Sequence, residues 1–194
     1  MTPATSSRLQ TRDLTYIAVS TVLMAVCAWI TIPLPKPFVQ FTLQTFALFL
    51  TLLVLGGRRG FYAMVVYLLL GAVGAPVFSG SRGGVGVLLD TTGGYILGFA
   101  AAALVFWMVT ALLGRSPAVS VAACVMALVV CYTFGTVWFL IVYTRTTGPV
   151  SLTSALSWCV IPYILPDLVK LALAAAVARR VVPLLERSGI AFPS

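Results

Sequence analysis

Histidine is absent from the 194-residue chain, and charged residues make up only 8% of it. Without histidine, the common zinc ligand sets, Ser-His-Asp triads and histidine general bases are excluded. A soluble domain carries about 25% charged residues, because its surface must be solvated. This chain is 61% hydrophobic, with a mean hydropathy of +1.10. The composition therefore indicates an integral membrane protein.

A nucleotide-binding lysine is also missing. Lys36 follows Pro35 and Lys170 follows Val169, so neither lysine stands in a G-x-x-x-x-G-K-[ST] phosphate loop. We expect no ATPase activity from the chain itself, and no metal or other cofactor. The cysteines lie within or beside apolar segments, where a thiol behaves as a small hydrophobe. We predict packing roles for all four of them: Cys27, Cys124, Cys131 and Cys159.

Basic residues outnumber acidic ones by 12 to 4. A nucleic-acid-binding protein gathers its basic residues on one solvated face, whereas here they interrupt apolar runs, so we expect no nucleic acid partner. Positive charge instead marks the cytoplasmic side of a membrane protein. One side would receive eight basic residues: Arg8, Arg12, Arg58, Arg59, Arg115, Arg179, Arg180 and Arg187. The other would receive Lys36, Arg82 and Arg145. This predicts a cell-membrane protein with both termini in the cytoplasm.

Six apolar stretches approach the length of about 20 residues that crosses a bilayer as a helix. They run over residues 14–32, 38–55, 61–78, 93–113, 118–143 and about 155–185. We predict an all-α integral membrane protein, in which residues 1–194 form one bundle of six transmembrane helices with short cytoplasmic tails. Of the outer connections, residues 33–37, 79–92 and 144–154, the second and third are longer than the inner turns. Long loops often carry binding sites, so we expect a ligand site that opens to the outside.

Asp167 and Lys170 interrupt the sixth stretch. An ionisable side chain within a span costs about 2.5–3.5 kcal/mol on insertion scales and is a functional candidate by default. Their i,i+3 spacing places both on one helix face. Pro166 suits a first helical position, which would put Asp167 at the positive helix N-terminus. Together they offer a carboxylate and an ammonium to one polar ligand. The alternative is a structural ion pair.

Other polar and small residues have two interpretations each. Gln44 can hydrogen-bond a ligand or another helix. The glycine-dense segment 76–95 can turn backbone N–H groups towards a ligand, or be a plain outer loop. Tyr143 and Trp158 can cover a ligand or belong to the interfacial aromatic belt. A stripe of small residues in the first stretch can dock another membrane protein or pack internally: Ala18, Thr21, Ala25 and Ala28.

Four motifs follow one another along the chain: Thr42-Leu43-Gln44-Thr45, the segment from Tyr67 to Phe78, Thr92-Gly93-Gly94-Tyr95, and Asp167-Leu168-Val169-Lys170. In this order they resemble the BioY family. That family comprises the biotin-binding S components of energy-coupling factor (ECF) transporters. The chain departs from the family pattern at Asp90-Thr91, where Gly-Pro is common, and at Leu165-Pro166, where Pro-Gly is frequent.

The resemblance implies a six-helix S component that captures biotin on the outer side of the membrane. It also implies a transmembrane coupling protein and two cytoplasmic ATPases as partners, with the small-residue face of the first helix as the docking face. Asp167 would suit the ureido N–H groups of biotin, and Lys170 its carboxylate or its ureido oxygen. The expected biotin-binding set is Gln44, Arg82, Gly83, Gly84, Thr92, Tyr95, Tyr143, Asp167 and Lys170.

Three other functions remain compatible with the residues. An S component for a different vitamin would need a different polar set around the sixth helix. A small membrane enzyme would use Asp167 as a base, although no second carboxylate lies within a span. A channel or facilitator would not show saturable, high-affinity binding.

Overall fold

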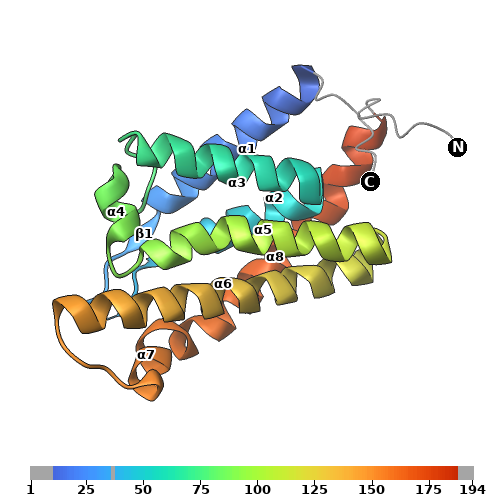
Figure 1. Ribbon diagram of the computed structural model, residues 1–194. Coiled ribbons are helices and arrows are strands. Elements are labelled where there is room, and N and C mark those ends of the chain that lie inside the picture. Colours follow the sequence, from blue (N-terminus) through green and yellow to red (C-terminus); the bar gives the residue numbers. More distant parts are fainter. Residues whose placement is uncertain (1–10, 36–37, 188–194) are drawn as a thin grey trace, which may run out of the picture.

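Helices make up almost the whole of the computed structural model, which describes residues 11–35 and 38–187 (Figure 1). Arg8 and Lys36, which entered the charge count, lie outside the described residues, as do the ends of both predicted tails. In chain order the elements are α1 (Thr11–Trp29), β1 (Thr31–Ile32), β2 (Phe41–Thr42), α2 (Gln44–Leu55), α3 (Gly57–Ala72), α4 (Val85–Leu89), α5 (Gly93–Leu113), α6 (Pro117–Thr146), α7 (Leu152–Cys159) and α8 (Ile161–Arg187).

Each of the six predicted stretches contains one main helix, and the all-α membrane class is confirmed. Four helical segments of the described chain are long and apolar enough to cross a bilayer: α1, α5, α6 and the α7–α8 segment Leu152–Arg187. The helices α2 and α3 are shorter, with 12 and 16 residues.

Three predicted boundaries were wrong. The first stretch ends in strand β1, and the second begins with strand β2 before helix α2 starts at Gln44. The third helix ends at Ala72, because the chain turns at Gly74, where φ is +105°. Apolar residues continue through these turns, so a prediction from hydrophobicity made the helices too long.

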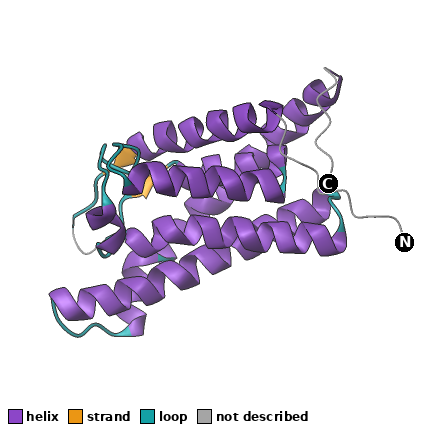
Figure 2. Cartoon of the chain, turned by 45° about the horizontal axis from the view of Figure 1, so that its top comes forward, coloured by secondary structure: helices purple, strands orange, loops and turns teal. Residues whose placement is uncertain are grey.

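The most extensive contact between helices is that of α5 with α6, and α5 packs against α3 on its other side (Figure 1). Helix α1 lies along α3, and α2 lies along α8. The two short strands, α4, α7 and their loops gather at one end of the bundle (Figures 1 and 2). The α2–α3 and α5–α6 turns lie at the opposite end, where Arg115 donates hydrogen bonds to the carbonyls of Leu53 and Val54.

Large apolar side chains cover much of the outside of the bundle. Val19, Val22 and Val26 are exposed on α1, and Leu112 on α5 is 81% exposed. Water would penalise so large an exposed apolar surface, whereas lipid tails solvate it. The exterior therefore fits a bundle that is embedded in a bilayer.

Glycines on α5 and α6 allow these two helices to approach closely. A Cβ at Gly94 would lie 2.1 Å from the Cβ of Trp138, and one at Gly135 would lie 2.2 Å from the Tyr95 ring. Trp138 also donates from Nε1 to the carbonyl of Asp90, 3.1 Å away. Gly94 thus serves close packing between α5 and α6. The close approach fixes Tyr95 and the start of α5 beside α6.

We predict that Gly94→Ala lowers the thermal unfolding midpoint of the detergent-solubilised protein by about 2–10 °C, because overpacking a tight contact costs about 1–3 kcal/mol. Gly86→Ala is the control, since a Cβ at Gly86 meets nothing within 4 Å. It should leave the midpoint unchanged or raise it slightly, because alanine favours helix over glycine. Equal shifts in the two variants would contradict this account of the α5–α6 contact.

Candidate functional site

A cavity of about 80 Å³ lies between the start of α2 and helices α5, α6, α7 and α8. One buried water needs only about 10–15 Å³, so the cavity has room for more than a single water. Its polar lining comes mainly from the β2–α2 junction and from α5, α6 and α8, and its apolar lining mainly from α5, α6 and α7. The lining residues are Val39, Gln40, Thr42, Gln44, Thr45, Ser79, Thr92, Tyr95, Ile96, Phe99, Cys131, Tyr132, Cys159, Tyr163, Asp167 and Lys170.

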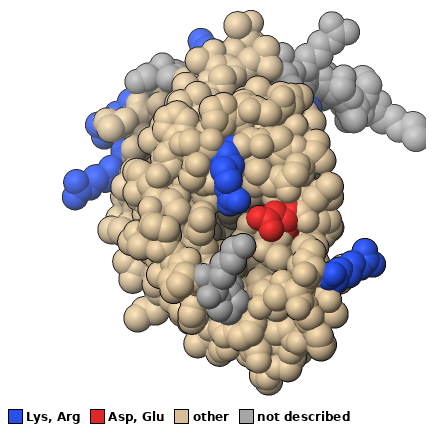
Figure 3. Space-filling view, turned by 90° about the vertical axis from the view of Figure 1, so that its left-hand side faces the viewer, with Lys and Arg blue, Asp and Glu red and all other residues tan. Residues whose placement is uncertain are grey.

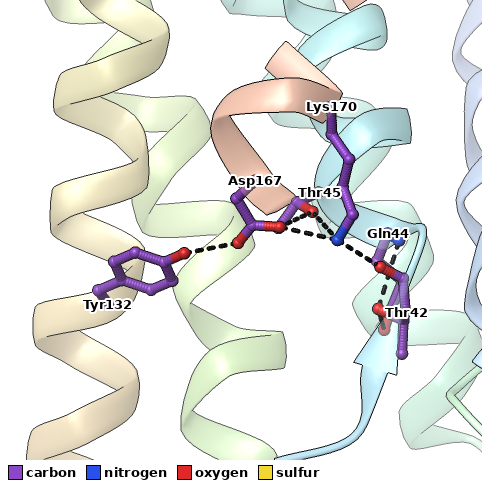
Figure 4. A network of polar contacts seen from close by, with 6 residues as sticks. All are labelled: Thr42, Gln44, Thr45, Tyr132, Asp167 and Lys170. Atoms are coloured by element: carbon purple, nitrogen blue, oxygen red, sulfur yellow. Dashed lines mark hydrogen bonds and ion pairs between the residues drawn. The ribbon is translucent and has the colours of Figure 1, made fainter. Parts of the chain in front are cut away.

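Asp167 and Lys170 form a buried ion pair at one side of the cavity. The residues are 3% and 6% exposed, and Lys170 Nζ lies 2.7 Å from Asp167 Oδ1. Asp167 also accepts hydrogen bonds from Thr45 Oγ1 at 2.8 Å and from Tyr132 Oη at 2.6 Å (Figure 4). A carboxylate has about four acceptor positions. Three are therefore occupied, and one remains on Oδ2.

Lys170 uses all three of its N–H groups within the chain. Besides Asp167, it donates to the Thr42 carbonyl at 2.7 Å and to Thr45 Oγ1 at 3.1 Å (Figure 4). Its ammonium lies 4.1 Å from the centre of the Phe41 ring, a favourable cation–π distance. The lysine thereby joins α8 to the β2–α2 junction, which supplies the carbonyl, the hydroxyl and the ring.

Helix α8 begins before Pro166, the start that the sequence suggested, and this corrects the environment assigned to Asp167. The helix starts at Ile161, so Pro166 lies inside it and Asp167 lies beyond the first turn. The field of a helix N-terminus acts mainly within that turn. Asp167 is instead stabilised by Lys170, Thr45 and Tyr132. The spacing argument was correct, since both charged groups occupy one face of α8.

The predicted ligand-binding residues divide into two groups in the structure. Five line the cavity: Gln44, Thr92, Tyr95, Asp167 and Lys170. Gly83, Gly84, Arg82 and Tyr143 do not, and their contact with a ligand stays a prediction. The backbone N–H of Gly84 donates to the Gly71 carbonyl at 2.7 Å, and a Cβ at Gly83 would lie 2.3 Å from the Ala75 oxygen. Both glycines therefore serve packing against the end of α3.

Arg82 and Tyr143 lie near the cavity without lining it. The Arg82 side chain is 41% exposed, and its guanidinium forms an ion pair with Asp90 at 3.6 Å. Its Nε donates to the carbonyl of Ser79, a lining residue. The loop-bearing end of the molecule is otherwise largely uncharged (Figure 3). Tyr143 stacks on Phe139 and packs against Trp158, in an apolar cluster that also contains the lining residues Tyr95 and Cys159.

The small-residue face of α1 mostly points inward. Thr21, Ala25 and Ala28 are buried, and Thr21 donates to the carbonyl of Ala63 on α3. Of the four residues, only Ala18 is exposed. The internal-packing interpretation describes three of these residues, and a docking role for this face stays a prediction.

Several lining residues had not been singled out from the sequence. Thr42 and Thr45 flank Gln44 in a recognised motif, so the motif itself was a signal for them. Tyr132 and Tyr163 lie within long apolar runs, where nothing in their spacing marks them. Tyr132 meets Asp167 across 35 residues of sequence, and Tyr163 donates from Oη to the carbonyl of Val39.

The remaining cavity wall is apolar and includes sulfur. Ile96 and Phe99 come from α5, and Cys131 and Cys159 from α6 and α7. All four cysteines are buried and unbridged. In the described residues, no group of three or more Cys, Asp or Glu side chains could hold a metal ion. The site can thus receive a small molecule with a polar hydrogen-bonding part and an apolar part.

Lipid-exposed helices around such a cavity are typical of one class of protein, the membrane-embedded proteins that bind a small polar molecule. Comparison with known proteins then gives the family. The model of the BioY family matches residues 2–187. The chain belongs to the BioY family.

Named relatives and a solved structure agree with this membership. The "Biotin transporter BioY" of Thermotoga maritima is 40% identical over 170 residues, which cover 87% of this chain and 95% of the relative. The "Probable biotin transporter BioY" of Pyrococcus horikoshii is 36% identical and covers 89% and 97%. A crystal structure of the S-component for biotin from an ECF-type ABC transporter superposes with a TM-score of 0.77 at 21% identity, covering 90% of this chain and 94% of that one. The structural likeness shows a shared fold.

Lys170→Met should destabilise the protein strongly, because breaking one side of a buried ion pair costs about 3–5 kcal/mol. The double variant Asp167→Asn/Lys170→Met removes both charges, so we predict that it recovers most of the stability that Lys170→Met loses. Thermal unfolding in detergent measures both. A double variant as unstable as Lys170→Met would show that the ion pair is a structural requirement of the fold.

Proposed function

We propose that the protein binds biotin with high affinity and is the substrate-specificity subunit, or S component, of an ECF-type vitamin transporter. The observation that carries the proposal is the buried Asp167–Lys170 pair beside an apolar cavity. Its family membership and the names of its relatives as biotin transporters support the ligand. Because its relatives are named as transporters, we favour ligand binding with a change in the side of the membrane to which the site opens, and not the alternative of an enzyme.

Biotin has the two chemical parts that the cavity can receive. Its ureido ring carries two N–H donors and a carbonyl acceptor, and its thiophane ring is apolar. Asp167 has one open acceptor position on Oδ2, next to the Tyr132 hydroxyl, for a ureido N–H. Ile96, Phe99, Cys131 and Cys159 form an apolar wall suited to the thiophane ring.

Lys170 would bind the ureido oxygen or the biotin carboxylate by exchanging one of its present hydrogen-bond partners for the ligand oxygen. All three of its N–H groups are already engaged, and the contact with Thr45 Oγ1, at 3.1 Å, is the longest. A ligand oxygen that replaces Thr45 would leave the contacts with Asp167 and the Thr42 carbonyl in place. The ammonium then keeps three partners, so the exchange avoids an unpaired buried N–H.

The distribution of charge supports a cavity that opens to the outside. Arg59 and Arg115 lie at the end of the bundle where α1 begins and α8 ends, and Arg59 forms an ion pair with Asp13. The cavity lies towards the other end, among the β2–α2 junction, α7 and the start of α5. The positive-inside rule then assigns the arginine-rich end, and both termini, to the cytoplasm.

A coupling protein and two ATPase subunits complete the proposed transporter. The chain has no phosphate-binding lysine loop of its own, so energy from ATP has to come from partners. Ala18 is the exposed member of the predicted docking stripe on α1.

Binding of radiolabelled biotin to the purified wild type should be saturable. We predict that Asp167→Asn weakens it about ten- to hundredfold, because a hydrogen bond to a charged group contributes about 1.5–3 kcal/mol. Glu186→Gln, which neutralises one exposed carboxylate near the end of α8, is the charge-matched control, and should bind within about twofold of wild type. A folded wild type that retains no biotin, or an Asp167→Asn variant that binds like wild type, would refute the proposed function or the proposed site, respectively.

The proposed orientation predicts opposite labelling of two exposed positions. The native cysteines are buried, so single added cysteines report selectively. In intact cells, a membrane-impermeant maleimide should label Ser81→Cys and should label Glu186→Cys only after the cells are broken. The reverse pattern would place the cavity mouth in the cytoplasm.

A further inference from the structure

Behind the cavity, a chain of hydrogen bonds connects Gln44 to the loop that follows α3. Gln44 Nε2 donates to Tyr67 Oη at 2.8 Å, and Tyr67 Oη donates to the Val77 carbonyl at 3.0 Å. Gln44 lines the cavity, whereas Tyr67 does not and is fully buried on α3. Tyr67 therefore reaches a bound molecule only through Gln44.

The direction of this chain is determined by its last member. A carbonyl oxygen only accepts, so the single hydroxyl hydrogen of Tyr67 is committed to Val77. Towards Gln44, Tyr67 Oη can then only accept, which requires the amide nitrogen of Gln44 to face it. The amide oxygen consequently faces Thr42, whose hydroxyl donates to Oε1 at 3.1 Å (Figure 4).

The Val77 carbonyl is held in place by its neighbour Phe78. The Phe78 side chain is fully buried and occupies the space that a side chain at Gly71 would need, since a Cβ there would lie 1.9 Å from its ring. It also packs edge-on against Tyr67, with ring centroids 5.5 Å apart. Reversing the Gln44 amide would set its oxygen against Tyr67 Oη, which has no hydrogen left to donate.

An amide with this orientation offers the cavity a second acceptor beside Asp167. Thr42 occupies one acceptor position of Gln44 Oε1, and the other is left for a ligand. In a five-membered cyclic urea the two N–H bonds point to opposite sides of the carbonyl, so one carboxylate cannot accept both. Asp167 has a single open position, and the other N–H requires another acceptor.

We propose that Tyr67 is a positioning residue, which orients the Gln44 amide so that its oxygen accepts the ureido N–H that Asp167 does not take. This inference rests on the proposed binding of biotin and adds a determinant of specificity for a cyclic urea. Tyr67 acts without touching the ligand.

A double-mutant cycle in equilibrium biotin binding tests this role. Tyr67→Phe keeps the ring that packs on Phe78 and removes the hydroxyl, and we expect it to weaken biotin binding about fivefold or more. Gln44→Met removes the amide with little change in length. In the Gln44→Met background, Tyr67→Phe should change the affinity less than about twofold, because residues that act through one another are not additive. Tyr62→Phe, on the same helix and outside the cavity lining, is the control and should bind like wild type.

An unchanged affinity in Tyr67→Phe, or an equal fold-loss in both backgrounds, would overturn the proposal, since the second result is that of a merely structural residue. If Gln44→Met does not fold, the two mono-N-methyl ureido derivatives of biotin replace it. Tyr67→Phe should then have little effect on the derivative methylated at the nitrogen that faces Gln44, and equal losses for biotin and both derivatives would overturn the proposal. A wild type that binds no biotin refutes the proposed function itself, which the variants do not test.

Discussion

The buried ion pair between Asp167 and Lys170 is the constraint on which the arrangement of the site depends. Two charges in a low-dielectric bundle are costly unless they are paired and hydrogen-bonded. Lys170 therefore requires the Thr42 carbonyl and the Thr45 hydroxyl, and Asp167 requires Thr45 and Tyr132. These partners come from the β2–α2 junction and from α6, so satisfying one pair on α8 sets the relative positions of three parts of the bundle.

The same contacts explain how a rigid site accepts a ligand. Hydrogen bonds link the Val77 carbonyl to Tyr67, and Tyr67 to Gln44. Gln44 is linked in turn to the Thr42 hydroxyl. The Thr42 carbonyl accepts from Lys170, which pairs with Asp167. Almost every hydrogen-bonding position is already used, and the open ones are few and directional. A ligand therefore gains affinity only when its own donors and acceptors match those positions. Preorganisation of this kind gives specificity, because an unmatched polar group would be buried without a partner.

Much of this architecture was predictable from the sequence, and the reasons differ by residue. Asp167 and Lys170 stood out because charge is costly in an apolar span, and their i,i+3 spacing placed them on one face. Gln44 stood out as an amide near a span end. Tyr132 and Tyr163 did not, because an aromatic residue in an apolar run reads as packing and their partners lie 35 and 124 residues away in the chain. The end of α3 and the start of α8 were missed because Val77, Phe78 and Ile161 are as hydrophobic as the helices beside them. The burial of Thr21, Ala25 and Ala28 required knowledge of which helix α1 faces.

The most direct test of the central claim is a structure of the protein determined with biotin bound. The account predicts the ureido ring between Asp167 and Gln44, within hydrogen-bonding distance of both, with the thiophane ring against Phe99 and Cys131. It also predicts that Lys170 keeps its contact with Asp167 in the occupied site. Biotin bound elsewhere, or bound in this cavity with its ureido ring away from Asp167, would contradict the account.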